Sequence, residues 1–313
     1  MKRERRRIII DTDPGIDDAV AILLALASPA LEVRGLTVVA GNAPLRYTVQ
    51  NALAICELAG RPEIKVFAGC AEPLKRPLVT ASIAHGETGL GDADLPAPVM
   101  AAQAAHAVDW LIEEVMAAPA GATTLCALGP LGNVATAFAA EPRLARHLRE
   151  IVIMGGAGPS GGNITPAAEF NIYADPDAAA VVFESGARLT LVPLDLTRQA
   201  ICTSERLERI RAIKRPAALA VARMLSFYND PTRHASRAAD PLHDACVIGY
   251  LLRPDLYAGH EVNVAVETVS DLTRGMTAMD LTGVSGRPAN CRVLHRLDAV
   301  GFYKLLIDAL ARL

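Results

Sequence analysis

The chain has 313 residues, of which 51% are hydrophobic, so it is long and apolar enough to bury a substantial core in one or two domains. A formal net charge of −3 gives no reason to expect nucleic acid as a partner, because such binding relies on clustered positive charge. No segment approaches the roughly 18 uninterrupted apolar residues of a membrane-spanning helix, so no membrane association is expected.

The first predicted element is a short strand that runs into a cluster of carboxylates. Ile8–Ile10 is apolar, Asp11–Asp18 contains four aspartates, and Ala19–Leu26 is typical of a buried helix. Pro14 and Gly15 mark the turn between strand and helix. Four negative charges in one turn repel each other, and a helix N-terminus offsets only about half a charge.

A bound cation would hold this turn together, and a site made only of oxygen ligands favours a hard ion such as Ca²⁺ or Mg²⁺. The alternative is that Asp17 or Asp18 only caps the helix, while Asp11 and Asp13 face water.

A rhythm of strand, small-residue turn and helix continues to Asp195. It predicts an α/β fold with a mostly parallel, open twisted sheet flanked by helices on both faces. No shift in composition marks a boundary, so residues 1–313 are expected to form a single domain. The predicted strands are Leu31–Ala40, Ile64–Ala68, Thr123–Leu128, Glu150–Met154 and Arg188–Leu194, and the helices are Tyr47–Leu58, Ala101–Ala118 and Val134–Ala140.

Two regions depart from this rhythm. Residues 72–98 are rich in Pro, Gly and Asp and contain a single histidine, His85. A loop of this length inside a domain is usually functional, and a mobile flap is favoured over a linker. After residue 195 the sequence is more helical, and it ends with the alternating strand Glu261–Glu267 and a turn-rich tail. The predicted helices of this half are Glu205–Ala212, Ala217–Tyr228 and His243–Leu252.

The cysteines and the N-terminal residues bear on the cellular compartment. The six cysteines form no CxxC pair and lie mostly in apolar segments, which is typical of buried free thiols under reducing conditions. The basic segment Lys2–Arg7 is followed by only three apolar residues, too few for the hydrophobic part of a signal peptide. We therefore expect a cytoplasmic protein.

In an open parallel sheet, ligands bind outside the carboxyl ends of the strands. Three further segments look able to join the polar groups at those ends: Asn163–Asn171, the His85 loop, and Pro241–Gly249, where His243 and Asp244 open an apolar helix. For His243, the alternative is a side chain near a helix cap that faces water. The polar groups expected at the strand ends are Asp11, Asp13, Asn42, the Leu128-Gly129 turn and Met154 onward.

Several known motifs do not fit. As an EF-hand, the aspartate turn would need glycine where Ile16 stands and glutamate where Ile22 stands. Gly156–Gly161 matches GxGxxG, but prolines and polar residues separate it from the next predicted helix, so a dinucleotide site is not expected. The aspartate turn is also similar to that of haloacid dehalogenase-like aspartyl phosphotransferases, which place Thr or Val where this chain has Gly15.

The segment Asp11–Asp18 resembles the DxDPGxDD signature of the inosine-uridine preferring nucleoside hydrolases. The likeness covers nearly the whole chain, with further blocks in the order of the family. The resemblance implies Ca²⁺-dependent hydrolysis of the N-glycosidic bond of ribonucleosides to ribose and free base. These blocks are Val39–Asn42, His85–Leu90, Leu128–Leu131, Ile153–Gly156, Asn163–Asn171, Pro241–Asp244 and Thr273–Met276.

The resemblance also implies roles for single residues. Asp13 would act both as a metal ligand and as the general base for the attacking water. His243 would protonate the departing base, assisted by His85, and Met154 would pack near the sugar. The metal ligands would be Asp13, Asp18, Asp244 and the backbone carbonyl of Leu128. The ribose hydroxyls would be held by Asp17, Asn42, Asn163, Glu169 and Asn171.

Two departures from the family pattern bear on these implications. Gly132 stands where the family often has Thr or Ser, although a backbone ligand at Leu128 would tolerate this change. Leu281 stands where members often carry Trp, and the only tryptophan, Trp110, lies on a distant predicted helix. Purine-specific members stack the base between indoles, so a base-nonspecific or pyrimidine-preferring enzyme is expected. The remaining candidates to contact the base are Phe170, Tyr228, His85 and His234.

The resemblance further implies a homodimer or homotetramer. Two other classes of function stay open at this point. One is the aspartyl phosphotransferase, and the other is a non-catalytic protein that binds ribose or nucleosides.

Overall fold

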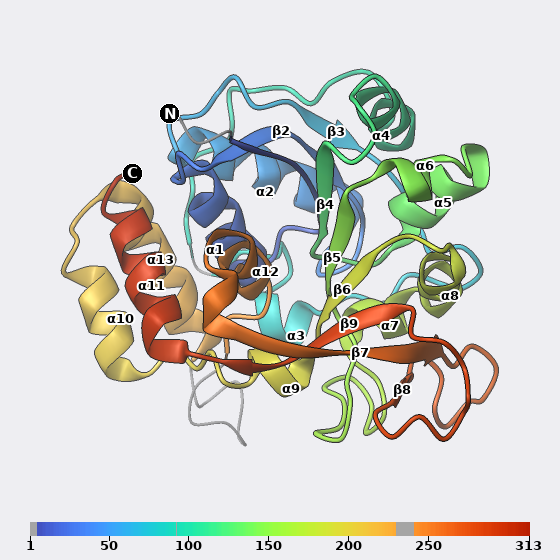
Figure 1. Ribbon diagram of the computed structural model, residues 1–313. Coiled ribbons are helices and arrows are strands. Elements are labelled where there is room, and N and C mark those ends of the chain that lie inside the picture. The colour runs from blue at the N-terminus through green and yellow to red at the C-terminus, as the bar shows by residue number, and fades with distance from the viewer. Residues whose placement is uncertain (1–4, 92, 230–240) are drawn as a thin grey trace.

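The computed structural model describes residues 5–91, 93–229 and 241–313 and shows a sheet between two layers of helices (Figure 1). Within these residues the strands follow the order β3-β2-β1-β4-β5-β6-β9-β7-β8. The strands are β1 (Arg6–Thr12), β2 (Leu31–Val38), β3 (Val66–Ala68), β4 (Thr123–Ala127), β5 (Glu150–Met154), β6 (Leu189–Val192), β7 (Tyr257–Val266), β8 (Thr277–Asp280) and β9 (Cys291–Leu297).

The sheet is mostly parallel, as predicted. β1 is the third strand from the β3 edge and pairs in parallel with β2 on one side and β4 on the other. Only β7 runs antiparallel to its neighbours, β9 and β8, at one edge. Ile8, Ile9 and Ile10 of β1 are all fully buried, because both faces of a parallel sheet are covered by helices.

Two separate cores lie on the two faces of the sheet. Ile8 and Ile10 pack into one core, while Ile9 points into the other, as the alternation of a strand requires. The first core includes α1 (Ile16–Leu26), α2 (Leu45–Leu58), α10 (Ser204–Arg211), α11 (Pro216–Tyr228), α12 (Ala245–Leu252) and α13 (Ala299–Leu310). The second includes α4 (Ala107–Met116), α5 (Gly132–Ala140), α6 (Leu144–His147) and α8 (Pro176–Glu184).

Short helices occupy the region where strands end. They are α3 (Ser82–His85), α7 (Phe170–Ala174) and α9 (Leu194–Thr197), which lie toward one end of the sheet (Figure 1). A 3₁₀ turn, η1 (Pro254–Leu256), leads into β7. None of the helices in the described ranges combines the length and the apolar composition needed to cross a membrane.

Most predicted elements are present with ends shifted by a few residues, but the expectation of a turn-rich tail is wrong. The C-terminal part contains β8, β9 and α13, and β9 enters the sheet between β6 and β7. Turn residues concentrate on either side of β8 and obscure the pattern of this short strand. Asp298 caps α13 by accepting hydrogen bonds from the backbone N–H groups of Val300 and Gly301.

The packing of α13 predicts a large effect of truncating Phe302. This side chain is 0% exposed, so Phe302→Ala should lower the free energy of unfolding by about 3–5 kcal/mol through lost burial and a residual cavity. Val300 on the same helix is 74% exposed, so Val300→Ala is the matched control and should change stability by less than about 0.5 kcal/mol. Urea denaturation followed by circular dichroism measures both, and equal effects would contradict the packing of this helix.

Candidate active site

The aspartate turn connects the carboxyl end of β1 to the start of α1. Gly15 is the N-cap of α1, and Asp18 Oδ2 accepts a hydrogen bond from the Gly15 N–H at 2.9 Å. One carboxylate therefore does cap the helix. The alternative prediction that Asp11 and Asp13 face water is wrong, since both side chains are fully buried.

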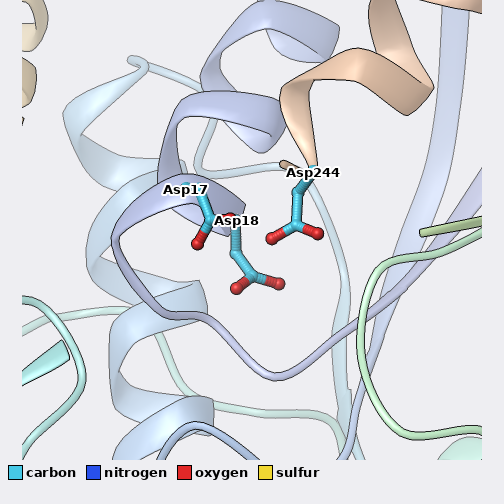
Figure 2. Close-up of side chains that lie close together, drawn as sticks. All are labelled: Asp17, Asp18 and Asp244. Carbon is cyan, nitrogen blue, oxygen red and sulfur yellow. The ribbon is translucent and has the colours of Figure 1, made fainter. Parts of the chain in front are cut away.

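Three carboxylates from two segments meet beside this turn. Asp17 and Asp18 come from the first turn of α1, and Asp244 immediately precedes α12 (Figure 2). Their ligand oxygens all lie within 4.8 Å of one another. Burial raises the pKa of Asp17 to about 6. Burial and then the neighbouring carboxylates raise the pKa of Asp18, and raise that of Asp244 well above its ordinary value.

Asp13 lies next to these three carboxylates, between the ends of β2 and β4. Its Oδ2 accepts a hydrogen bond from the Asn42 N–H at 2.6 Å. A Cβ at Gly41 or at Gly129 would overlap the Asp13 carboxylate, so both positions require glycine. Burial, followed by repulsion from Asp18, raises the pKa of Asp13 well above its ordinary value.

The buried oxygens of this site fit a divalent cation. Within the described residues, Asp13 Oδ1 and Asp244 Oδ1 are buried without a hydrogen-bond partner. An unpaired buried carboxylate oxygen is costly, and a hard cation with oxygen ligands would remove that cost. The backbone oxygen of Leu128 accepts a hydrogen bond from Asn171 Nδ2 at 2.7 Å and keeps a second lone pair for an ion.

The grouping of carboxylates differs in one respect from the expected ligand set of Asp13, Asp18 and Asp244. The mutually close triplet contains Asp17 in place of Asp13. Asp17 thereby becomes a further candidate for the metal, while Asp13 stays close enough to raise the pKa of Asp244.

Asp11 belongs to a separate network below the turn. Its Oδ1 accepts hydrogen bonds from Thr37 Oγ1 at 2.6 Å and from Asn133 Nδ2 at 2.8 Å. Its backbone oxygen accepts from the Leu128 N–H at 2.7 Å, and burial raises the pKa of the Asp11 carboxyl to about 6. Asp11 therefore links β1, β2, the end of β4 and α5 below the turn.

Asn42 and Asn171 connect the strand ends that surround the carboxylates. Asn42 Nδ2 donates to Asp18 Oδ2 at 3.0 Å and to the Asp13 backbone oxygen at 3.2 Å, which leaves its Oδ1 as an acceptor for a ligand. Asn171 Nδ2 donates to the Leu128 oxygen and, at 3.2 Å, to the oxygen of the buried Met154.

Glu169 is buried and caps α7. Its two oxygens accept hydrogen bonds from the N–H groups of Asn171 at 2.8 Å, Gly156 at 2.9 Å and Ile172 at 3.2 Å. Burial outweighs these bonds and raises the pKa of Glu169 to about 7. A carboxyl group with this pKa can accept or donate a hydrogen bond to a ligand hydroxyl near neutral pH.

The two histidines of interest are both buried. His85 Nδ1 accepts a hydrogen bond from the Ile16 N–H at 3.0 Å, and its ring centroid lies 5.4 Å from that of Tyr228. His243 is 7% exposed and its Nδ1 lies 2.7 Å from Thr197 Oγ1. The alternative that His243 faces water is therefore wrong.

Other predicted residues are less closely tied to the site. Asn163 is exposed, and its Oδ1 accepts from the Phe170 N–H at 2.9 Å. Phe170 is buried, and His234 lies outside the described residues. Trp110 stacks on Phe67 with ring centroids 4.2 Å apart, inside the second core.

Several residues around the site were not predicted. Thr12 Oγ1 donates to Asp18 Oδ1, Thr197 pairs with His243, and Asn51 donates to backbone oxygens of two loops. A polar residue on the buried face of a predicted helix was the available signal for Asn51. Thr12 and Thr197 carried no distinguishing signal beyond their positions near strand ends.

Comparison with known proteins identifies the family. The family model described as inosine-uridine preferring nucleoside hydrolase matches residues 8–304. The pyrimidine-specific ribonucleoside hydrolase RihA of Shewanella sp. strain ANA-3 is 45% identical over 310 residues, covering 98% of this chain and 96% of the relative.

Solved structures agree with this match. A plant nucleoside hydrolase, PpNRh1, superposes with a TM-score of 0.92 at 34% identity and covers 98% of this chain and 99% of its own. A purine-preferring ribonucleoside hydrolase from Gardnerella vaginalis has a TM-score of 0.91 at 31% identity, with 97% and 98% covered.

These matches set aside the aspartyl phosphotransferase and the non-catalytic binding protein. With a family match over nearly the whole chain, a shared fold and a buried carboxylate site at the strand ends, the chain belongs to the inosine-uridine preferring nucleoside hydrolases, which cleave the N-glycosidic bond of ribonucleosides.

Proposed function

We propose that this chain is a Ca²⁺-dependent ribonucleoside hydrolase that either prefers pyrimidine nucleosides or does not discriminate between bases. The observation that carries the proposal is the group of buried carboxylates with unpaired oxygens at Asp13 and Asp244. Such a site favours a hard cation, and its anionic surroundings would stabilise a sugar that gains positive charge in an oxocarbenium-like transition state.

In this proposal the ion is held by Asp13, Asp18, Asp244 and the backbone oxygen of Leu128. When bound, it would lower the pKa of a water molecule and hold the ribose diol. Asp13 is the general base: the Asn42 N–H fixes its Oδ2, and its unpaired Oδ1 can take the proton of the attacking water.

Ribose would be held by side chains at the ends of several strands. Asn42 offers its Oδ1, and Glu169 offers a carboxyl group with a pKa near that of the surrounding solution. Met154 is buried beside Asn171 and would pack against the sugar. We assign the hydroxyl contacts to Asp17, Asn42, Asn163, Glu169 and Asn171.

His243 is proposed to protonate the departing base. The Thr197 hydroxyl lies 2.7 Å from its Nδ1 and orients the ring, and we assign the proton transfer to Nε2. His85 would assist from the opposite loop, where the Ile16 N–H orients it. Two roles are considered for Asp17: a contact to the sugar, or a ligand of the metal.

The base preference is proposed from what surrounds the site. Trp110 is packed against Phe67 and is not available to stack on a base. The similar protein from Shewanella is named pyrimidine-specific, whereas the structural relative from Gardnerella is named purine-preferring. The absence of an indole favours the pyrimidine or nonspecific choice, with Tyr228, Phe170, His85 and His234 as candidate base contacts.

We also propose a single domain over residues 1–313, because the described strands hydrogen-bond into one sheet. All six cysteines are free and five are buried, which supports a reducing compartment such as the cytoplasm. A homodimer or homotetramer is proposed from the resemblance to the family.

Ribose release tests the proposed reaction. The purified protein should release reducing sugar from uridine and cytidine at least as fast as from inosine, a strong chelator should abolish release, and added Ca²⁺ should restore it. Asp13→Ala should remove the activity, because it deletes the carboxylate proposed to take the water proton. Much faster turnover of inosine would contradict the base preference, and full activity with chelator would contradict the metal.

Single substitutions in the aspartate turn separate metal ligands from sugar contacts. Asp13→Asn, Asp18→Asn and Asp244→Asn should each weaken Ca²⁺ binding at least about tenfold, or about 1.4 kcal/mol, in calorimetry. Asp17→Asn should raise KM and leave Ca²⁺ binding unchanged. Among the four aspartates of the turn, Asp11→Asn should reduce the hydrolytic activity least.

Asp175→Asn is the matched control for this series. Asp175 is equally buried but caps α8, where it accepts from the Ala178 N–H at 3.0 Å, and it should leave Ca²⁺ binding unchanged. Weakened Ca²⁺ binding in Asp17→Asn would instead place Asp17 among the metal ligands.

The raised pKa values predict how stability depends on pH without metal. Burial raises the pKa of Asp11 and Asp17 to about 6 and the pKa of Glu169 to about 7 in the folded chain, against pKa values of roughly 4 when unfolded. The folded chain therefore binds more protons in this interval, and its stability should fall as pH rises from about 4 to about 7. Thermal unfolding with chelator should give a lower Tm at pH 7.5 than at pH 5.

Saturating Ca²⁺ should raise the Tm most at the higher pH, because the ion binds deprotonated ligands. A metal-free Tm that increases between pH 5 and pH 7.5 would contradict the raised pKa values.

A further inference from the structure

We infer that Asn51 of α2 is a positioning residue for the active site, whose side-chain amide fastens the loop carrying His85 to the aspartate turn. The inference rests on the proposed function, because it assigns Asn51 to the site where a ribonucleoside is to bind.

One amide group makes both connections. Asn51 Nδ2 donates to the Pro14 backbone oxygen at 2.9 Å and to the Thr88 backbone oxygen at 2.7 Å. Pro14 directly follows Asp13 in the aspartate turn, and Thr88 lies three residues after His85. Both hydrogens of the amide are therefore used, one on each of two loops that are far apart in the sequence.

His85 supplies a second connection between the same loops. Its Nδ1 accepts from the Ile16 N–H, so a neutral ring carries its proton on Nε2. A Cβ at Gly15 would lie 2.6 Å from this Nδ1, so glycine there is what lets the imidazole approach the turn. The orientation of His85 thus depends on the loop staying close to Pro14–Ile16.

A glycine also permits the His85 loop to approach the Asn51 side chain. Gly89 has φ of +97°, and a Cβ there would lie 2.9 Å from Asn51 Nδ2 and 3.0 Å from the Pro14 oxygen. The Gly91 N–H donates to the His85 backbone oxygen at 2.8 Å and closes the loop upon itself. The loop is thereby shaped to bring the Thr88 oxygen to the Asn51 amide.

Packing of α2 does not account for an asparagine at this position. Asn51 is only 9% exposed, on the face that also buries Ala52 and Ile55 in the first core. An aliphatic side chain there would be a better helix former and would avoid the cost of burying an amide. The two bonds offset that cost, and both of them go to loops at the site and none to the helix itself.

Loss of the Asn51 amide should release the His85 loop without dismantling the metal site. For Asn51→Ala and Asn51→Leu we expect kcat/KM for uridine to fall at least about tenfold, because small misplacements of a binding group are costly. Ca²⁺ binding should change less than about threefold, since Asn51 contributes no ligand. Asn51→Leu restores volume without donors, so it separates hydrogen bonding from packing.

A double-mutant cycle tests whether Asn51 acts through His85. The losses in Asn51→Ala and His85→Ala should not add in the double variant, because each removes the same placement of the loop. In addition, hydrogen exchange at the Ile16 and Gly91 amides should be faster in Asn51→Ala, and faster exchange confined to these loops is not expected from a general loss of stability.

Asn290 provides the matched control. Its Nδ2 also bridges two backbone oxygens, of Phe183 at 3.0 Å and of Val264 in β7 at 2.9 Å. Asn290→Ala should leave kcat/KM within about threefold of the wild type.

The outcomes distinguish the two levels of inference. A wild-type chain that releases no ribose would overturn the proposed function. If the wild type is active, three results would overturn the role of Asn51 and leave the proposed function standing. They are that Asn51→Leu retains kcat/KM, that the losses in Asn51→Ala and His85→Ala are additive, or that both Asn51 variants unfold while Asn290→Ala stays folded.

Discussion

The mutual repulsion of buried carboxylates is the constraint on which the rest of the site depends. Asp13, Asp17 and Asp18 belong to one turn, and Asp244 is brought to them from a segment more than two hundred residues later. Burial removes the water that would screen these charges, so each oxygen needs an N–H, a hydroxyl, a proton or a cation. Asn42, Thr12 and Gly15 supply three such donors, and the unpaired oxygens mark where a cation would lie.

The sheet satisfies this constraint by geometry. Parallel strands end at the same edge, so Asp13, Asn42, Leu128 and Met154 become neighbours although each lies at or just after the end of a different strand. Glycines at positions 41 and 129 let the neighbouring strand ends close upon the Asp13 carboxylate. Glu169 and Asn171 enter from a short helix and complete the ring of polar groups around the site.

Much of this could be predicted from local sequence. Apolar runs followed by small-residue turns predicted β1 to β6 and the helices α1, α2, α4 and α5, and the aspartate turn alone indicated a hard cation. The position of β9 could not be predicted, because strand order depends on pairing between distant segments. The partners Thr197 for His243 and Asn51 for the His85 loop are likewise tertiary contacts. The periodicity of a sequence can indicate that a polar side chain is buried, but it does not predict which group will be its hydrogen-bond partner.

The insertion of β9 between β6 and β7 has a consequence for how the chain reaches its folded state. During synthesis, β6 remains an open edge of the sheet until Cys291–Leu297 has been made, since no earlier strand in the described part of the chain pairs with that side. Contacts of such long sequence separation slow folding and leave unpaired strand edges exposed to other chains. The aspartate turn, although it follows the first strand, is therefore part of a sheet that closes only after residue 297 has been made.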